Sequence, residues 1–384
     1  MSRLRFAIGG GSRRRGGHTG FPVGPGSESP NLIRLMLSPR LTDHTTLRLG
    51  GAAGQILAAG DERSLIDAVR DADAEGTDLL LIGGGSNIVA ADENPADLAV
   101  LIATTGITID GDLVRVAAGE SWDPFVARCV SEGRDDVACL SGIPGSIGAT
   151  PIQNVGAYGQ EVAALIASVR VFDRVEGTVR VLDRDACEFG YRTSRFKRDP
   201  ARFVVLDVTF RLPVGGGCEV HYGELATSLG VAVGERIDGQ AVRDAVLALR
   251  RGKGMVLDPA DPDTVSAGSF FTNPLLEPEH FAALEQRVRK RLGDGVVPPR
   301  FPAANGSTAV KTSAAWLIER AGFSRGYGSP TGIAISSKHV LALTNRGSGT
   351  TAELVKLARE IATGVEDAFG VTLVPEPVFV GHRW

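Results

Sequence analysis

Three stretches of this 384-residue sequence carry side chains that could act together on an anionic ligand. Ser269 lies beside a glycine in an apolar stretch, which suits a reactive hydroxyl but is more often typical of a buried turn serine. Glu376 stands between two prolines, and this restricted backbone suits a catalytic carboxylate as well as the end of an edge strand. The stretch 190–197 (GYRTSRFK) mixes aromatic and cationic groups that can hold an anion, although surface arginines are usually only solvated.

A first glycine-rich segment, Gly83-Gly84-Gly85-Ser86-Asn87, directly follows the apolar run 78–82 (DLLLI). Glycines after a buried strand let phosphate oxygens reach backbone N–H groups, and Ser86 and Asn87 add further donors. The segment lacks the GxGxxG pattern of a Rossmann site and the lysine of a P-loop. A turn that ends a strand is the more frequent explanation for such a segment taken alone.

A second glycine-rich segment, 141–161, has no helical or alternating pattern, and Glu161 is its only charged residue. It is too long and too apolar for a solvated connection, and long loops inside compact chains are usually functional. Gln153 and Asn154 can donate and accept hydrogen bonds. We expect either a surface for a large, partly aromatic, phosphate-bearing cofactor or a loop packed under another domain.

The composition excludes several classes of protein. Hydrophobic content is 43%, charged content 22% and net charge −4, which is ordinary for a globular protein and argues against binding nucleic acid. No apolar run approaches the length of a membrane span. The six histidines include no HxxxH pair, and the four cysteines have no metal-like spacing, so we expect no metal site, reduced thiols and a cytoplasmic location.

The elements that must position these residues follow from periodicity and capping signals. The chain is long enough for two or three domains, after an arginine-rich, disordered extension at residues 1–36. We predict strands at 55–59, 78–82, on both sides of the turn at 110–112, and at 165–173, 179–182, 203–212, 339–343 and 371–374. We predict helices capped by Asp61 and Ser121, and others at 240–251, 278–292, 308–321 and 350–368, the last with a Thr350/Glu353 capping box.

Seven short motifs occur in order along the chain: GGGSN (83–87), GIPGSIGATPIQNVGAYGQEV (142–162), GYRTSRFK (190–197), YGEL (222–225), AGSFFTNP (267–274), AAWLIERAGF (314–323) and LVPEPVF (373–379). Together they resemble the UDP-N-acetylenolpyruvoylglucosamine reductases of bacterial peptidoglycan synthesis. The resemblance covers about residue 37 to the C-terminus, and the tyrosine motif is similar to that of the family's first type.

This resemblance implies an α+β protein, with a two-subdomain FAD-binding fold of the vanillyl-alcohol-oxidase type and a C-terminal α+β substrate domain. It implies an NADPH-dependent flavoenzyme, active as a cytoplasmic monomer, that converts UDP-N-acetylenolpyruvoylglucosamine to UDP-N-acetylmuramate. Non-covalent FAD would pass hydride from its N5 to the enol ether. The resemblance implies a first FAD-binding subdomain at 37–103, joined by the C-terminal segment 371–384, and a second FAD-binding subdomain at 104–254. The substrate-binding domain would be 255–370.

The resemblance also implies roles for individual residues. Arg192 would contact the substrate carboxylate, and Glu376 would be its partner carboxyl. Ser269 would be the general acid that protonates the carbon bearing the substrate carboxylate. The nucleotide sugar would contact Tyr222, Lys253, Asn273 and Arg320. FAD would contact Gly83, Gly84, Gly85, Ser86, Asn87, Ile143, Gly145, Ser146, Gly148, Ala149 and Gln153. Thr272 departs from the family pattern, because a basic residue is common at that position.

Two other functions are compatible with these motifs. One is a different FAD-dependent alcohol or sugar-lactone oxidoreductase on the same fold. Several such enzymes attach flavin through histidine or cysteine, but neither glycine-rich segment contains a histidine and Cys139 lies just outside. The other is a protein that binds a nucleotide sugar without turnover. The presence of Ser269, Arg192 and Glu376 argues against it.

Overall fold

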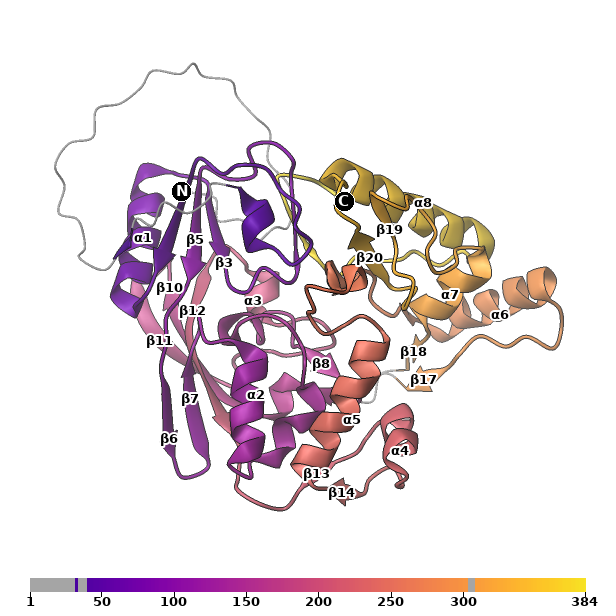
Figure 1. Ribbon diagram of the computed structural model, residues 1–384, viewed down its shortest axis with the longest axis horizontal. Helices are drawn as coiled ribbons and strands as arrows, with labels where there is room; N and C mark the ends of the chain where they lie inside the picture. Colours follow the sequence, from indigo (N-terminus) through magenta and orange to yellow (C-terminus); the bar gives the residue numbers. More distant parts are fainter. Residues whose placement is uncertain (1–31, 34–39, 303–307) are drawn as a thin grey trace.

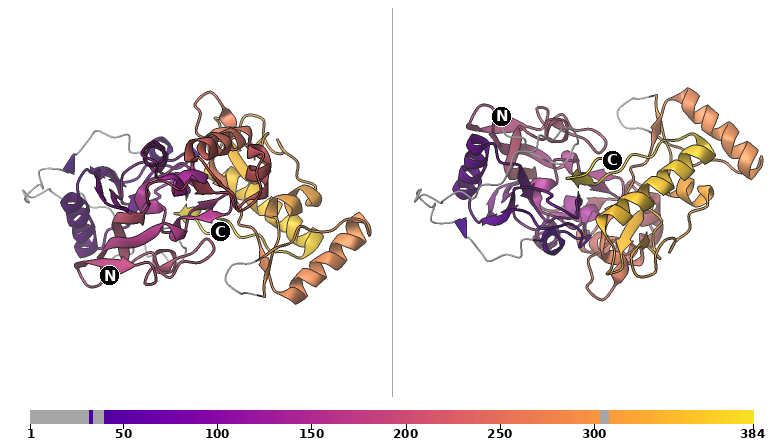
Figure 2. Two further views of the ribbon diagram at one scale, coloured as in Figure 1. Left: turned by 90° about the horizontal axis from the view of Figure 1, so that it is seen from below. Right: turned by 90° about the horizontal axis from the view of Figure 1, so that it is seen from above.

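The computed structural model describes residues 32–33, 40–302 and 308–384, and it confirms the predicted α+β class (Figure 1). Figure 2 shows from two directions that the indigo and magenta segments form one end of the molecule and the orange and yellow segments the other. The C-terminus lies between these two ends. The predicted disordered extension lies outside the described residues, apart from Leu32–Ile33, which form β1.

The first sheet has the strand order β1-β2-β5-β3, with β2, β5 and β3 parallel to one another. The prediction of β2 (Gln55–Ala59) is confirmed, and β3 (Leu79–Ile82) and β5 (Leu98–Ile102) follow it. Helix α1 (Glu62–Glu75) begins where Asp61 accepts a hydrogen bond of 2.8 Å from the backbone N–H of Ser64. Its apolar face packs into the same core as residues of the second sheet.

The second sheet is antiparallel, with the strand order β11-β10-β12-β7-β6. Its strands are β6 (Ile107–Asp110), β7 (Leu113–Ala117), β10 (Ile166–Asp173), β11 (Thr178–Asp183) and β12 (Phe203–Arg211). Gly111, at φ 57°, permits the tight turn between β6 and β7. Helices α2 (Trp122–Ser131) and α5 (Gly239–Gly252) contribute apolar residues to the same core, as their periodicity predicted.

Among its described residues, the C-terminal part holds two three-stranded sheets and three α-helices. One sheet contains β15 (Ser266–Ser269), β20 (Ala342–Asn345) and β19 (Ile333–Ile335); the other contains β16 (Leu275–Leu276), β18 (Val310–Lys311) and β17 (Phe301–Pro302). The helices are α6 (Pro278–Leu292), α7 (Ala314–Ala321) and α8 (Thr351–Phe369). The capping box at Thr350 and Glu353 is confirmed.

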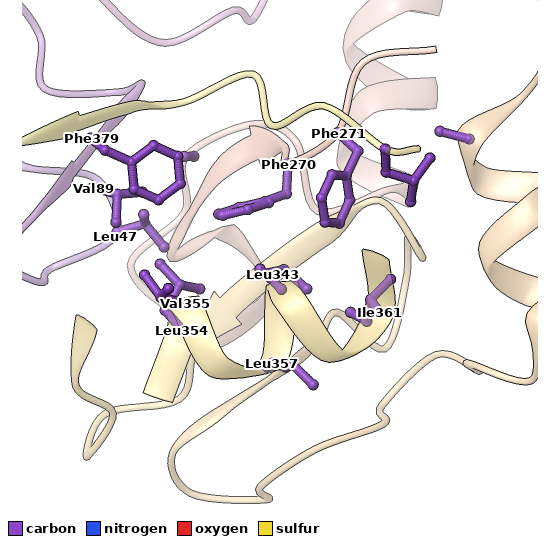
Figure 3. Packing of buried hydrophobic residues seen from close by; sticks show 14 of the residues in the cluster. Leu47, Val89, Phe270, Phe271, Leu343, Leu354, Val355, Leu357, Ile361 and Phe379 are labelled. Carbon is purple, nitrogen blue, oxygen red and sulfur yellow. The ribbon is translucent and has the colours of Figure 1, made fainter. Parts of the chain in front are cut away.

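One apolar core joins this C-terminal part to the first sheet. Figure 3 shows Phe270 and Phe271 between side chains of α8 and Phe379, with Leu47 and Val89 from the N-terminal part beside Phe379. Strand β21 (Val378–Val380) pairs in parallel with β4 (Ile88–Ala90), which directly follows the first glycine-rich segment. The end of the chain is therefore fixed against the N-terminal part.

Three sequence predictions in the C-terminal part are corrected. The helix predicted at 308–321 begins only at Ala314, because Val310–Lys311 form β18. The strand predicted at 339–343 lies at Ala342–Asn345, since the Ser336 hydroxyl accepts from the N–H groups of residues 338 and 339 and closes a turn there. Residues 371–374 form no strand; the last strand follows the prolines instead.

The remaining elements are short. They are the pair β8 (Gly156–Ala157) and β9 (Gln160–Glu161), the pair β13 (Cys218–Glu219) and β14 (Arg236–Ile237), and helices α3 (Arg195–Arg198) and α4 (Gly223–Leu229). Across the described residues, every helix is either too short or too polar to span a membrane. All four cysteines are free and buried.

Candidate active site

Segments far apart in the sequence surround one cavity of about 510 Å³. Both glycine-rich segments line it, together with α3, the end of β15 and the segment that leads into β21. The three residues expected to carry out chemistry, Arg192, Ser269 and Glu376, all lie in its wall. So do ten of the expected FAD contacts, namely Gly83, Gly84, Gly85, Ser86, Asn87, Ile143, Gly145, Ser146, Ala149 and Gln153.

The glycines of the first segment permit a very close approach of two backbones. A Cβ on Gly84 would lie 2.6 Å from Cα of Gly145, and one on Gly85 would lie 1.9 Å from the carbonyl oxygen of His44. The Ser86 hydroxyl donates to the carbonyl of Pro144 at 3.0 Å, which holds the two segments together. A side chain at Gly84 would therefore separate the segments and change the cavity wall.

The second glycine-rich segment is held in place by polar contacts from α2 and from the first glycine-rich segment. The Asp123 carboxylate of α2 accepts from the backbone N–H of Gly142 at 2.6 Å and from Arg243 of α5 at 2.7 and 2.9 Å. The Asn87 amide donates to Gln153 at 2.7 Å and to the carbonyl of Glu376 at 3.3 Å. This loop is therefore an ordered wall of the cavity.

Arg192 and Glu376 form an ion pair in the cavity wall, with Nε of the arginine 3.2 Å from Oε1 of the glutamate. The two terminal nitrogens of the guanidinium donate to the carbonyls of Asn154 (3.3 Å) and Gly156 (2.8 Å), so the loop fixes its orientation. Nε is buried and makes no hydrogen bond within the described residues. Arg192 also has a φ of 51°, which costs a residue with a side chain about 1–2 kcal/mol.

Backbone hydrogen bonds bring the residues that follow Ser269 against the segment that contains Glu376. The N–H of Glu376 donates to the carbonyl of Phe270 at 2.8 Å, and the N–H of Thr272 donates to the carbonyl of Val374 at 3.0 Å. These bonds hold the segment after β15 against the segment before β21. A hydroxyl, a carboxylate and a guanidinium from three distant parts of the chain therefore face one cavity.

Several cavity residues were not assigned from the sequence. Lys197 was quoted only as part of a motif, and Arg250 and His382 lie in stretches without a distinctive pattern. Burial lowers the pKa of the Lys197 ammonium; the Glu376 carboxylate opposes this shift and Arg192 adds to it. The His382 Nε2 is buried without a hydrogen-bond partner in the described part of the chain. Trp384 lines the cavity too and packs against Phe271.

Five of the residues predicted for the site do not line this cavity. Gly148 lies behind the wall, where a Cβ would come within 2.6 Å of the Ala118 side chain. The Asn273 side chain accepts from the N–H of Ala314 at 3.0 Å, at the start of α7. Arg320 is exposed and lies over the Trp316 ring. The other two are Tyr222 and Lys253.

Tyr222 and Lys253 meet in a second cluster. The Tyr222 and Tyr158 rings are 5.8 Å apart in an edge-to-face arrangement, and Lys253 lies 5.9 Å from the centre of the Tyr158 ring. The Lys253 ammonium pairs with Glu224 of α4 at 2.7 Å. Burial, followed by the charge of Lys253, lowers the pKa of His339 to about 4, so this imidazole is neutral at pH 7. Tyr222 is 43% exposed.

Two known families match the chain. Residues 53–183 match the family described as FAD binding domain, and residues 259–380 match the C-terminal domain of UDP-N-acetylenolpyruvoylglucosamine reductase. The UDP-N-acetylenolpyruvoylglucosamine reductase of Streptomyces coelicolor is 57% identical over 340 residues, covering 88% of both chains. That of Thermobifida fusca is 54% identical over 349 residues, covering 89% of this chain and 96% of its own.

A solved structure shares the fold. It is UDP-N-acetylenolpyruvylglucosamine reductase from Thermus caldophilus, which aligns with a TM-score of 0.60 at 22% sequence identity. The alignment covers 89% of this chain and 97% of the other. At this level of identity the likeness concerns the fold alone, and it supports the same succession of sheets and helices.

Asp123→Asn should loosen the second glycine-rich segment and change the pH dependence of stability. Burial opposes ionisation of the Asp123 carboxyl, but hydrogen bonds from Arg243 and Gly142 outweigh it and lower its pKa. The carboxylate therefore stabilises the fold above the unfolded pKa of about 4, and this contribution disappears as the pH falls through the lower folded value. Urea unfolding of the variant at pH 7 should show a loss of about 1–3 kcal/mol.

The matched control for this variant is Glu132→Gln. Glu132 pairs with Arg128 on the surface of α2, where both side chains are at least one-third exposed. Exposed pairs contribute less than about 1 kcal/mol, so this change should leave stability nearly unaltered. The role of Asp123 would be contradicted if Asp123→Asn and the unmodified protein had the same free energy of unfolding, within experimental error, at every pH between about 3 and 7.

Proposed function

The chain belongs to the UDP-N-acetylenolpyruvoylglucosamine reductase family, and from this premise we propose how its residues carry out the reaction. The protein is an FAD-dependent oxidoreductase that reduces UDP-N-acetylenolpyruvoylglucosamine, a step in the synthesis of peptidoglycan precursors. We propose that NADPH is its reductant, that the product is UDP-N-acetylmuramate, and that it works as a monomer in the cytoplasm.

The observation that carries the proposed mechanism is the composition of the single cavity. Glycine backbones close to one another, an ion pair of Arg192 and Glu376, and the hydroxyl of Ser269 line the same space of about 510 Å³. Cofactor and substrate sites of this size typically combine mostly apolar walls with a few convergent polar groups. Here the polar groups lie where a carboxylate-bearing substrate could meet a flavin.

The residues of the cavity fit FAD. At Gly83, Gly84 and Gly85 any Cβ would collide with a neighbouring segment, and the backbone of Gly84 is exposed, which suits the approach of a diphosphate. The apolar side chains of Ile143, Ile152 and Val155 suit an aromatic ring system. We propose that 83–87 hold the diphosphate and 143–153 surround the rest of the cofactor, without a covalent bond.

When bound, FAD supplies the transfer of hydride from NADPH to the enolpyruvyl group. The chain's own residues then have to handle the negative charge that develops near the substrate carboxylate. Arg192 is oriented by two carbonyls, so its charge is fixed in place before the reaction and needs little reorganisation. We propose that it binds the substrate carboxylate, with Glu376 as its partner in the cavity wall.

We propose that Ser269 supplies the proton that completes the reduction. Ser269 lines the cavity at the end of β15, and the next residue, Phe270, accepts a hydrogen bond from the N–H of Glu376. A free serine hydroxyl is a weak acid, so its donation depends on nearby cations that stabilise the alkoxide. Arg192 and Lys197 are the cations of this part of the cavity.

The nucleotide sugar would extend from this cavity toward the second cluster. We propose that Tyr222 and Lys253 contact it there, since an exposed tyrosine and a cation suit a base and a diphosphate. In this scheme 37–103 with 371–384, together with 104–254, hold the cofactor, and 255–370 present the substrate. Asn273 and Arg320 also stay predicted substrate contacts; in the structure Asn273 accepts from the N–H of Ala314 and Arg320 lies over the Trp316 ring.

Gly84→Ala should lower the amount of FAD that copurifies with the protein. The added methyl group would lie 2.6 Å from Cα of Gly145, a backbone atom that cannot move aside without separating the two segments. Gly60→Ala is the matched control, because a Cβ there meets nothing within 4 Å. The ratio of flavin to protein absorbance should fall at least about tenfold for the first variant and stay unchanged for the second. Full flavin content in Gly84→Ala would refute the role of this close approach.

Ser269→Ala should separate the two halves of the reaction, and it tests the proposed function directly. Stopped-flow absorbance should show reduction of the bound flavin by NADPH at a nearly normal rate. Its reoxidation by the enolpyruvyl sugar should slow by about 10²–10⁴, the usual effect of removing a general acid. Unchanged reoxidation would reject Ser269 as the proton donor. Failure of the unmodified protein to reoxidise with this sugar would reject the proposed function itself.

A further inference from the structure

We propose that Lys197 is a positioning residue for the substrate carboxylate, acting through Arg192 and through its own charge. The inference rests on the proposed function and deepens it, because the anion it concerns is the enolpyruvyl carboxylate. Neither the backbone conformation of Arg192 nor the charge balance of the cavity is explained by the residues assigned above. Lys197 accounts for both.

The first observation concerns the backbone of Arg192. Its φ of 51° is unfavourable for a residue with a side chain and must be held by its surroundings. Gly190 and Thr193 exchange two backbone hydrogen bonds, of 3.0 and 3.1 Å, and so close a tight turn around it. The carbonyl of Arg192 accepts from the Lys197 ammonium at 3.0 Å. Lys197 therefore holds the carbonyl of the residue whose guanidinium faces the cavity.

The second observation is that Lys197 is itself firmly placed. It lies on α3, where its backbone N–H donates to the Ser194 hydroxyl at 3.3 Å. That hydroxyl is fully buried and donates in turn to the carbonyl of Ile152 at 2.6 Å, in the second glycine-rich segment. The turn that carries Arg192 and the loop that orients its guanidinium are thus connected through the capping serine of α3.

The third observation is the balance of charge. The ionisable side chains that line the cavity are Arg192, Lys197, Arg250, Glu376 and His382. Arg192 and Glu376 neutralise one another as an ion pair. Arg250 lies under the electrostatic influence of Tyr158 and Asp123, whereas Lys197 is influenced by Glu376 and Arg192. Lys197 is therefore the further cation that acts on this ion pair.

These observations lead to a specific consequence for ligand recognition. Without Lys197, the ion pair of Arg192 and Glu376 would present no net charge to an incoming carboxylate, and the strained turn would lose a hydrogen bond. Both effects weaken the binding of a ligand with an enolpyruvyl carboxylate. They should leave the binding of the same nucleotide sugar without that carboxylate unchanged.

Calorimetric titration of the oxidised holoenzyme, without NADPH, tests this inference. The two ligands are UDP-N-acetylenolpyruvoylglucosamine and UDP-N-acetylglucosamine, which lacks the carboxylate. Lys197→Met should weaken binding of the first at least about tenfold, as expected for the loss of a hydrogen bond to a charged group, and change that of the second less than about twofold. Lys197→Arg keeps the charge and should recover most of the lost affinity.

Arg198→Met is the matched control, because this neighbouring cation of α3 is exposed and pairs with Glu188 on the surface. It should bind both ligands normally. Unchanged affinity of Lys197→Met for the enolpyruvyl sugar would overturn the inference. Equal losses for both ligands, loss of flavin, or failure of Lys197→Arg to recover affinity would show a merely structural role and overturn it too. If the unmodified protein binds neither ligand, the proposed function fails instead.

Discussion

The close approach of the backbones of Gly84 and Gly145 is the constraint on which the candidate site depends. The two glycines belong to segments separated by some sixty residues of sheet and helix, and a single Cβ would push them apart. The Ser86 hydroxyl and the Asn87 amide then bind the same loop from the first segment. One wall results in which glycines of both segments line the cavity with little side-chain bulk, and such a surface suits a large phosphate-bearing cofactor.

The C-terminal part brings the chemistry to that wall. Strand β21 pairs with β4, directly after the first glycine-rich segment, so the segment with Glu376 must pass across the cavity. The same segment exchanges backbone hydrogen bonds with the residues after Ser269. A shared apolar core, shown in Figure 3, makes this arrangement rigid because Phe270 and Phe271 are buried against α8. The proposed catalytic groups, which come from distant parts of the chain, can thus be held at fixed distances from a cofactor.

The sequence predicted those parts of the fold that have a local cause. The cap at Asp61, the capping box at Thr350 and the two-residue turn at Gly111 each depend on neighbours within a few positions, and all were found as predicted. The last strand was misplaced because its partner, β4, lies almost 300 residues away and leaves no local pattern. The predicted helix at 308–321 was too long for the same reason, since β18 exists only through its pairing with β16 and β17.

The candidate site also contains some residues that the sequence identified and others that it did not. Motif resemblance named Arg192, Ser269 and Glu376, and the fold brings all three to one cavity. Lys197 was overlooked because a lysine on a short polar helix resembles a surface residue, and only the left-handed turn at Arg192 directs its ammonium inward. His382 and Trp384 have no motif and reach the cavity through the β21 pairing. The placement of Lys197, His382 and Trp384 in the cavity wall depends on contacts between distant segments, so it cannot be predicted from their local sequence.

The central claim is that cofactor and substrate meet in the one cavity between the two glycine-rich segments. A crystal structure of the protein with FAD and the enolpyruvyl sugar would test it most directly. It should show one FAD against residues 83–87 and 143–153, with the substrate carboxylate at Arg192 and the Ser269 hydroxyl facing the enolpyruvyl group. A flavin bound elsewhere, or a substrate carboxylate remote from Arg192, would contradict the account.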